Sequence, residues 1–187
     1  MSSNLSRACL LPLLAWTVAP LLAGAVDINV SDDAVRAVYI AQFEEPGLEL
    51  DFGWLHHTDD GDVGTVGLQI VEFGDRSTAS WNFGLGGKLF YVDGGNEDGS
   101  GLSLGGQAGY RPSSFRKFEA VLRVFYASRA ICFGDLEEFL DADLTAGFWL
   151  LPRGKIYLGV REVRADFENG SRRTIDRGVH LGLRIGF

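Results

Sequence analysis

The sequence has little of what would hold a chain together covalently or anchor it through a helix. It has two cysteines, Cys9 and Cys132, and Cys9 lies in a segment that we predict to be removed. A single remaining thiol cannot form an internal disulfide. After residue 25, no stretch approaches the roughly 20 consecutive apolar residues that a membrane-spanning helix needs. The fold must therefore be stabilised by its secondary structure, and only strands could take the chain across a membrane.

Positive charge and catalytic signatures are also scarce. The chain has 17 Lys and Arg against 25 Asp and Glu, a formal net charge of −8. Because nucleic-acid backbones demand clustered cations, this balance argues against nucleic acid as a partner. The sequence contains no zinc-type His/Cys array and no phosphate-binding loop. These absences favour a protein that is not an enzyme and that carries no cofactor.

Residues 1–25 are typical of a secretory signal peptide. Arg7 precedes an almost unbroken apolar run, and Ala23-Gly24-Ala25 has the small-x-small form of a cleavage site. Pro12 and Pro20 and the short length argue against a retained helix. We therefore expect cleavage after Ala25 and a single mature domain over residues 26–187.

Most of the remaining chain alternates between apolar and polar residues in segments of about ten, separated by polar turns. In one of them, Trp81 and Tyr91 stand at the two ends of an apolar face. Ten residues at ~3.3 Å rise and ~40° tilt span roughly 25 Å, the height of the apolar band of an outer-membrane barrel. The expected strands are 34–42, 47–57, 63–73, 80–92, 102–111, 118–129, 138–151, 155–166 and 177–187.

These segments predict an all-β fold, a closed antiparallel transmembrane up-and-down β-barrel. Nine strands can be counted, and bacterial single-chain barrels have an even number. A short first strand in residues 26–31 would make about ten, whereas fusion of the N-terminal pair would leave eight. Such barrels carry tight turns at the periplasmic end and longer loops outside. We therefore expect the polar connections to face the exterior: 58–62, 93–101, 130–137 and 166–176.

The last strand resembles the C-terminal strand of outer-membrane barrels, which the outer-membrane assembly machinery recognises. Its apolar face reaches a terminal aromatic and consists of Val179, Leu181, Leu183, Ile185 and Phe187. This pattern predicts location in the cell outer membrane. The expected partners are outer-membrane lipid and lipopolysaccharide and the assembly machinery, and we expect the barrel to be a monomer.

The opposite face of the strands would line the lumen, and its charges balance. The expected cations are Arg36, Lys88, Arg111, Arg123, Arg161 and Arg184, and the expected anions are Asp27, Glu49, Asp51, Glu119, Asp141 and Asp143. The interior of an eight- to ten-stranded barrel is barely wide enough for side chains. We therefore expect these charges to pair across the lumen and plug it. The alternative is a narrow solute path between them.

Chemically, the densest segment is Trp54–Asp62, which holds two histidines and three aspartates. Asp59, Asp60 and Asp62 are weak candidates for a metal site or a general base. The favoured interpretation is a hairpin, because Asp-Gly promotes a tight turn. His56 and His57 would point to opposite faces of a strand, so both could not approach one metal ion.

Several short motifs of the mature chain are shared with a known family. They are Trp54 with His57-Thr-Asp59-Asp60-Gly61-Asp62-Val63, then Val66-Gly67-Leu68, Gly86-Gly87-Lys88 and the closing strand 179–187. On these motifs the sequence resembles the YfaZ family of small outer-membrane β-barrel proteins, over nearly the whole mature chain. The resemblance implies fold and location, sometimes a porin-like role, and no catalytic residues.

The function expected from the sequence is that of an integral outer-membrane barrel with a structural or porin-like role. Two other classes stay open. One is an outer-membrane enzyme that acts on lipid or peptide through His180 or the Asp59–Asp62 rim, although we favour a hydrogen-bonded lumen residue for His180. The other is a soluble periplasmic barrel that binds a ligand.

Overall fold

Strands make up nearly all of the described chain. The computed structural model describes residues 23–43, 47–76, 79–94, 97–168 and 170–187. The strands are β1 (Ala23–Val30), β2 (Ala34–Gln42), β3 (Leu48–His57), β4 (Gly61–Arg76), β5 (Ala79–Asp93), β6 (Asp98–Pro112), β7 (Phe118–Ala127), β8 (Cys132–Gly134), β9 (Leu136–Leu151), β10 (Gly154–Phe167) and β11 (Arg172–Gly186). Within this described part there are two 3-10 turns, η1 (Ser113–Phe115) and η2 (Arg129–Ile131). No described helix has the length and apolar character needed to span a membrane.

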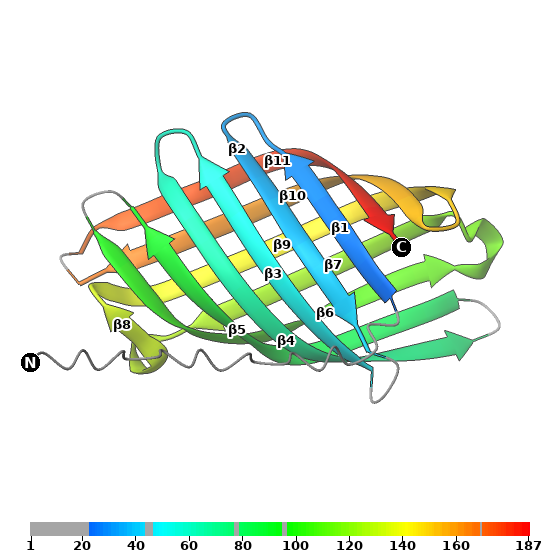
Figure 1. The fold of residues 1–187 in the computed structure, drawn as a ribbon, viewed down its shortest axis with the longest axis horizontal. Helices are drawn as coiled ribbons and strands as arrows, with labels where there is room; N and C mark the ends of the chain where they lie inside the picture. The colour runs from blue at the N-terminus through cyan, green and yellow to red at the C-terminus, as the bar shows by residue number, and fades with distance from the viewer. Residues whose placement is uncertain (1–22, 44–46, 77–78, 95–96, 169) are drawn as a thin grey trace, which may run out of the picture.

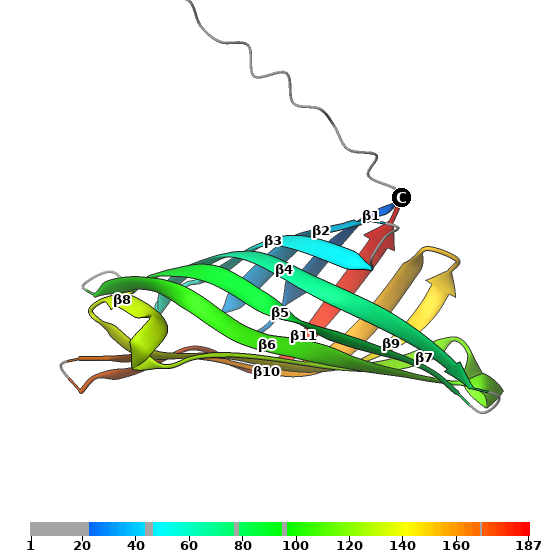
Figure 2. The ribbon, with the colours of Figure 1, turned by 90° about the horizontal axis from the view of Figure 1, so that it is seen from below.

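The strands close into one antiparallel barrel. Neighbouring long strands pair in sequence order, and β1 pairs with β11 from Ala25–Gly186 to Val30–Leu181. Ten strands form the wall, because the three-residue β8 pairs with β6 beside it rather than within the circuit. In Figures 1 and 2, β1–β5 cross at an angle over β6, β7 and β9–β11. The predicted fold class is confirmed, and the eight-strand alternative is wrong because β1 and β2 are separate strands.

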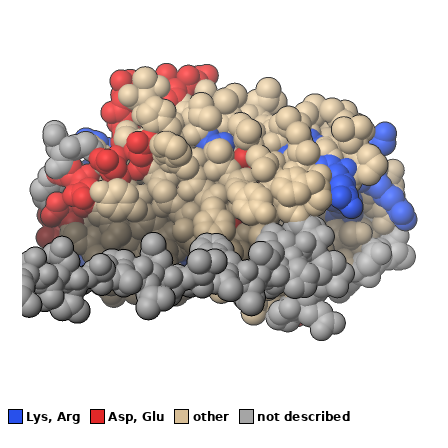
Figure 3. All heavy atoms as spheres, in the orientation of Figure 1, with Lys and Arg blue, Asp and Glu red and all other residues tan. Residues whose placement is uncertain are grey.

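The two ends of the barrel differ, and we name them by their connections. The loop end carries the β1–β2, β3–β4, β5–β6 and β10–β11 connections and the segment between β7 and β9. The terminal end carries Phe187 and the β2–β3, β4–β5, β6–β7 and β9–β10 turns. Acidic side chains gather at the left of Figure 3, the loop end, and basic ones at the right. The assignment of the loop end to the exterior stays a prediction.

The outer wall is apolar, as the alternation predicted. On β11, Val179, Leu181, Leu183 and Ile185 are exposed, whereas His180 between them is buried. Large exposed apolar side chains occur on every long strand of the wall. So wide a band of exposed apolar surface is abnormal for a protein in water and suits a hydrocarbon environment.

Several strand ends lie beyond the predicted boundaries. The expected loop 166–176 is largely strand, since β10 continues to Phe167 and β11 begins at Arg172. A bulge between Val163 and Arg164 shifts the register, so that Ile175 and Asp176 are both buried. A bulge places two residues opposite one, and strict alternation in the sequence cannot reveal it.

At its N-terminal end, β1 begins before the predicted cleavage site. Ala23 is opposite Gln42, and Gly24 N donates to Phe187 O at 3.1 Å while Phe187 N donates to Gly24 O at 2.9 Å. Cleavage after Ala25 would therefore leave β1 shorter by its first three residues, Ala23, Gly24 and Ala25. The boundary itself stays a prediction.

An apolar cluster fills the lumen at the loop end. Its buried members are Leu55, Val63, Phe90, Val92, Ala127, Leu136, Phe139, Val163, Ala165, Phe167 and Ile175. The rings of Phe90 and Phe139 stack with centroids 4.1 Å apart. Ile131 and Cys132, from the segment between β7 and β9, pack against the cluster. The core of this barrel is thus displaced toward one mouth.

Candidate functional site: the charged lumen

Ion pairs between buried side chains fill the centre of the lumen, and one of them joins opposite walls. Arg36 on β2 donates two hydrogen bonds to Asp141 on β9, of 3.2 and 2.8 Å. Lys88 Nζ on β5 lies 3.3 Å from Asp51 Oδ1 on β3, and 4.4 Å from the centre of the Phe125 ring. All four charged side chains are buried. The Arg36–Asp141 pair thus crosses the lumen, whereas Lys88 and Asp51 pair along the wall, over Gly67 of the intervening β4.

A second network joins the strands that close the barrel. Arg184 Nε on β11 donates to Asp27 Oδ2 on β1 at 2.9 Å, and Tyr157 on β10 donates to the other oxygen of Asp27. Asn29 Nδ2 donates to the Tyr157 hydroxyl at 2.9 Å. Arg161 on β10 binds both Asn29 and Asp176. These bonds reinforce the β1–β11 closure from inside the lumen.

A third group lies at the terminal end. Glu119 on β7 accepts from Arg111 Nη2 at 3.0 Å and from Lys155 Nζ at 2.6 Å. Arg111 and Lys155 also lie over the Trp149 ring, 5.1 and 5.4 Å from its centre. Both carboxylate oxygens of Glu119 are thus occupied by cations, one from the adjacent β6 and one from β10, which lies beyond β9.

The twelve lumen charges expected from the sequence all occupy inward-facing, buried or half-buried positions. Ten of them form five pairs, of which Arg123 with Asp143 is the longest at 3.6 Å. The other two differ from the expectation. Arg161 pairs with Asp176, which was expected in a loop, and Glu49 accepts a hydrogen bond from the amide of Gln42 at 3.0 Å.

Several polar residues of the networks were not predicted from the sequence, among them Asn29, Lys155, Tyr157 and Asp176. Lys155 and Tyr157 share the inward face of β10 with Arg161, so strict alternation could have found them. Asp176 could not be found in this way, because the bulge reverses the alternation at that point.

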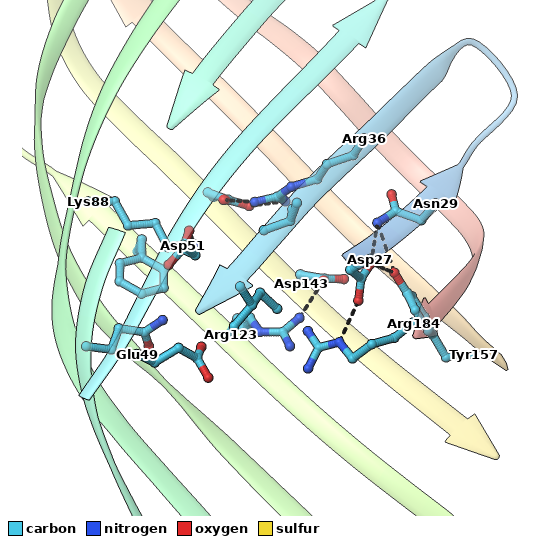
Figure 4. A pocket seen from close by; sticks show the side chains of 15 residues that line it. Asp27, Asn29, Arg36, Glu49, Asp51, Lys88, Arg123, Asp143, Tyr157 and Arg184 are labelled. Carbon is cyan, nitrogen blue, oxygen red and sulfur yellow. Dashed lines mark hydrogen bonds and ion pairs between the residues drawn. The ribbon is translucent and has the colours of Figure 1, made fainter. Parts of the chain in front are cut away.

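Little space is left between these side chains. Figure 4 shows the central region, where side chains from opposite walls point at one another around a cavity of about 30 Å³. Inward-facing glycines make the fit possible. A Cβ on Gly182 would overlap the Tyr157 ring, and one on Gly67 would overlap the Asp51 carboxylate.

Some buried polar atoms in the described part make no hydrogen bond within the chain. They include both carboxylate oxygens of Asp51, Oδ1 of Asp143 and both ring nitrogens of His180. Nε2 of His180 lies 3.3 Å from Asp143 Oδ1 without hydrogen-bond geometry. The expectation of a lumen position for His180 is confirmed, but the expected hydrogen bonds are not made.

The aspartate-rich segment forms the β3–β4 hairpin, with its turn at 58–60. His57 Nδ1 accepts from the backbone of Asp59 and Asp60, at 3.2 and 3.0 Å, while Asp62 lies 2.6 Å from the exposed His56. The two histidines therefore differ in exposure, as expected for opposite faces. Among the residues that the structure describes, no group of three or more His, Cys, Asp or Glu side chains is arranged for a metal ion.

One catalytic-looking pattern is present that the sequence analysis did not use. Gly101-Leu102-Ser103-Leu104-Gly105 has the Gly-x-Ser-x-Gly form. In hydrolases this pattern forms a sharp turn between a strand and a helix that exposes the serine. Here it lies within β6, and the buried Ser103 hydroxyl donates to the backbone oxygen of Lys88 at 3.2 Å. This geometry is that of a strand residue rather than a nucleophile.

The chain is similar to several known proteins. The family described as "YfaZ precursor" matches residues 3–187. The chain belongs to the YfaZ family. Outer membrane protein YfaZ of Escherichia coli (strain K12) is 26% identical over 148 residues, 77% of each chain. Two solved structures are also similar: a KdgM porin (TM-score 0.44, 10% identity, 89% of this chain and 99% of that one) and the outer membrane channel DcaP of Acinetobacter baumannii (0.39, 13%, 86% and 54%).

This YfaZ-family chain is an outer-membrane β-barrel protein. The family resemblance and the predicted location are confirmed. The alternative of a soluble periplasmic barrel is wrong, because the relative is named as an outer membrane protein and the outer wall is apolar. The description of the family as a precursor agrees with the predicted signal peptide.

Proposed function

We propose that the protein is a non-enzymatic outer-membrane barrel whose lumen is closed to ions and solutes. The observation that carries this proposal is the filling of the lumen. The apolar cluster occupies the loop end, and ion-paired side chains, with Arg36 and Asp141 joined across the lumen, fill the remainder around a cavity of about 30 Å³. A water molecule needs roughly 10–15 Å³ measured in this way. The cavity thus has room for about two waters, and it offers no path for a hydrated ion.

Two closures would then act in series. At the loop end, packed apolar side chains exclude water. In the centre, the charged groups are held by partners on the same wall or, for Arg36 and Asp141, on the opposite wall. Moving either member of a pair would leave its partner unpaired in a poorly solvated space. This arrangement favours a structural role over a constitutive pore.

The enzyme alternative finds little support in the site geometry. Both His180 and Ser103 are buried, and the carboxyl group facing His180, on Asp143, lies beside Arg123. A catalytic group must come within hydrogen-bond reach of its substrate. The inward position of these side chains removes them from lipid or peptide at the barrel surface.

The proposed surroundings follow from the outer wall. Outer-membrane lipid and lipopolysaccharide would contact its apolar band. The assembly machinery would recognise the β11 face of Val179, Leu181, Leu183, Ile185 and Phe187, all of them exposed. A closed hydrogen-bonded circuit leaves no edge strand for a second copy, which favours a monomer.

Conductance in planar bilayers tests the closed lumen directly. Purified full-length protein, shown to be folded by its heat-modifiable migration, should give no steady current above that of a mock preparation. Reproducible single-channel currents from the unmodified protein would overturn the proposal and establish the porin-like role in its place.

A further inference from the structure

Two neighbouring turns at the terminal end form a basic surface. The β6–β7 turn carries Arg116 and Lys117, and the β9–β10 turn carries Arg153. The turns lie side by side, since Trp149 N donates to Lys117 O at 2.8 Å just before the second turn. We call this surface the basic rim, and it consists of Arg116, Lys117 and Arg153.

The charge of the basic rim is not neutralised by the chain. All three side chains are exposed, and none forms an ion pair with a described residue. Neither turn contains a carboxylate over 112–118 or 150–154. The nearest carboxylate along the chain, Glu119, is already occupied by Arg111 and Lys155. Three positive charges therefore remain available to an external anion.

Apolar side chains adjoin these cations. Phe115, 53% exposed, packs against Phe118 and Phe148, with ring centroids 6.3 and 5.7 Å apart. Leu150 and Leu151 are also exposed. At this end the outward apolar column begins with Phe118 on β7 and ends with Phe148 and Leu150 on β9. The basic rim thus lies just beyond the apolar band, at the level where lipid headgroups begin.

The loop end has the opposite character. Two of its exposed cations are paired, Arg129 with Glu137 and Glu168, and Arg172 with Asp166, whereas the exposed Arg177 forms no ion pair with a described residue. Its surface in Figure 3 is dominated by acidic groups. A phosphate-bearing lipid would therefore be attracted to the terminal end and repelled by the loop end.

We propose that the basic rim binds the phosphate headgroup of an anionic glycerophospholipid in the leaflet around the terminal end, with the acyl chains against Phe115 and Leu151. Clustered Lys and Arg at a membrane surface attract anionic headgroups. The inference is independent of whether the lumen conducts.

Lipid retention, measured by native mass spectrometry, tests whether the basic rim binds an anionic phospholipid. The folded barrel is equilibrated in detergent with equal amounts of phosphatidylglycerol and phosphatidylcholine, and the bound lipids are counted. The wild type should retain phosphatidylglycerol in preference. The variant Arg116→Gln/Lys117→Gln/Arg153→Gln should lose roughly tenfold or more of that preference, because each surface cation contributes about fivefold.

Matched variants separate the basic rim from general charge effects. Arg129→Gln/Arg172→Gln, at the loop end, should leave the preference unchanged, and Arg116→Lys/Arg153→Lys should preserve it. Equal retention of the two lipids by the wild type, or equal loss in the loop-end variant, would overturn the proposal. Displacement of phosphatidylglycerol by a phosphorylated glycolipid that needs the same three residues would overturn the choice of lipid.

Discussion

At the residue scale, the lumen pairs differ in how firmly they are held. Arg36 and Asp141 are both buried and share two hydrogen bonds. Arg123 is half-buried, and its Nη1 stays 3.6 Å from Asp143 while its Nε donates to Gln107 at 3.2 Å. Breaking a buried pair leaves an uncompensated charge, whereas a partly solvated partner can turn to water. The lumen charges balance in number, but the individual pairs therefore differ in how much they contribute to stability.

The variant Arg36→Ala should destabilise the barrel by about 3 kcal/mol, because Asp141 would be left buried without a partner. Unfolding by denaturant in lipid vesicles measures this free energy. Arg123→Ala should have a smaller effect. The double variant Arg36→Met/Asp141→Leu, which removes both charges, should recover most of the loss. A change below about 1 kcal/mol in Arg36→Ala would mean that water already screens the pair.

At the element scale, β11 both closes the barrel and presents the proposed assembly face. Its inward residues bind β1 and β10 through Arg184 and Asp176, while its outward residues are apolar. The alternation of the last eleven residues predicted this division correctly. The start of the strand was predicted five residues too late, at 177 rather than at Arg172, because a bulge interrupts the pattern there.

We expect Leu183→Asp to reduce the amount of assembled barrel. Leu183 faces outward and is 45% exposed, so the variant would place a carboxylate against hydrocarbon. This placement should cost about 1–2 kcal/mol of folding free energy. Heat-modifiable protein in outer-membrane fractions is the readout, with Leu183→Val as the control. Normal levels of folded Leu183→Asp protein would show that this face does not meet lipid.

Sidedness is a second property of the elements that can be measured. Thr58→Cys lies in the β3–β4 turn at the loop end, and Arg153→Cys lies in the β9–β10 turn at the terminal end. Both cysteine substitutions are made in a variant that also carries Cys132→Ser. Burial and the nearby Glu138 raise the pKa of the Cys132 thiol, so this thiol would react only slowly with a maleimide. The Cys132→Ser substitution removes that slow background reaction.

An impermeant maleimide should label Thr58→Cys on intact cells and should label Arg153→Cys only after the outer membrane is permeabilised. The reverse pattern would place the loop end in the periplasm. It would also move the proposed phospholipid site to the outer leaflet.

At the scale of the whole molecule, the barrel is asymmetric along its axis. The loop end is acidic outside and apolar inside, whereas the terminal end is basic outside and ion-paired inside. The packing of apolar residues inside the loop end was not predicted, since ion pairs alone were expected to plug the lumen. The buried residues of the apolar cluster come from seven different strands, so only the folded barrel brings them together.

Opening the apolar cluster should therefore admit ions more readily than breaking one ion pair. Phe90→Ser/Phe139→Ser replaces the stacked rings with small polar side chains that water can hydrate. In planar bilayers this variant should conduct, while the wild type and Arg36→Met/Asp141→Leu stay closed. Heat-modifiable migration checks that the Phe variant still folds. A folded but silent Phe variant would assign the closure to the ion pairs alone.

The sequence by itself determined the antiparallel barrel, its apolar outer wall and the inward position of twelve charges, because a period of two residues assigns each side chain to a face. Only the tertiary structure decided between eight and ten strands, which charges meet, that Glu49 pairs with an amide, that Asp176 enters the lumen, and that apolar residues fill one mouth. The physical reason is that alternation is a local property of each strand. Pairing across the lumen depends on the stagger between strands, on a bulge and on the reach of side chains, which are set only when the barrel closes.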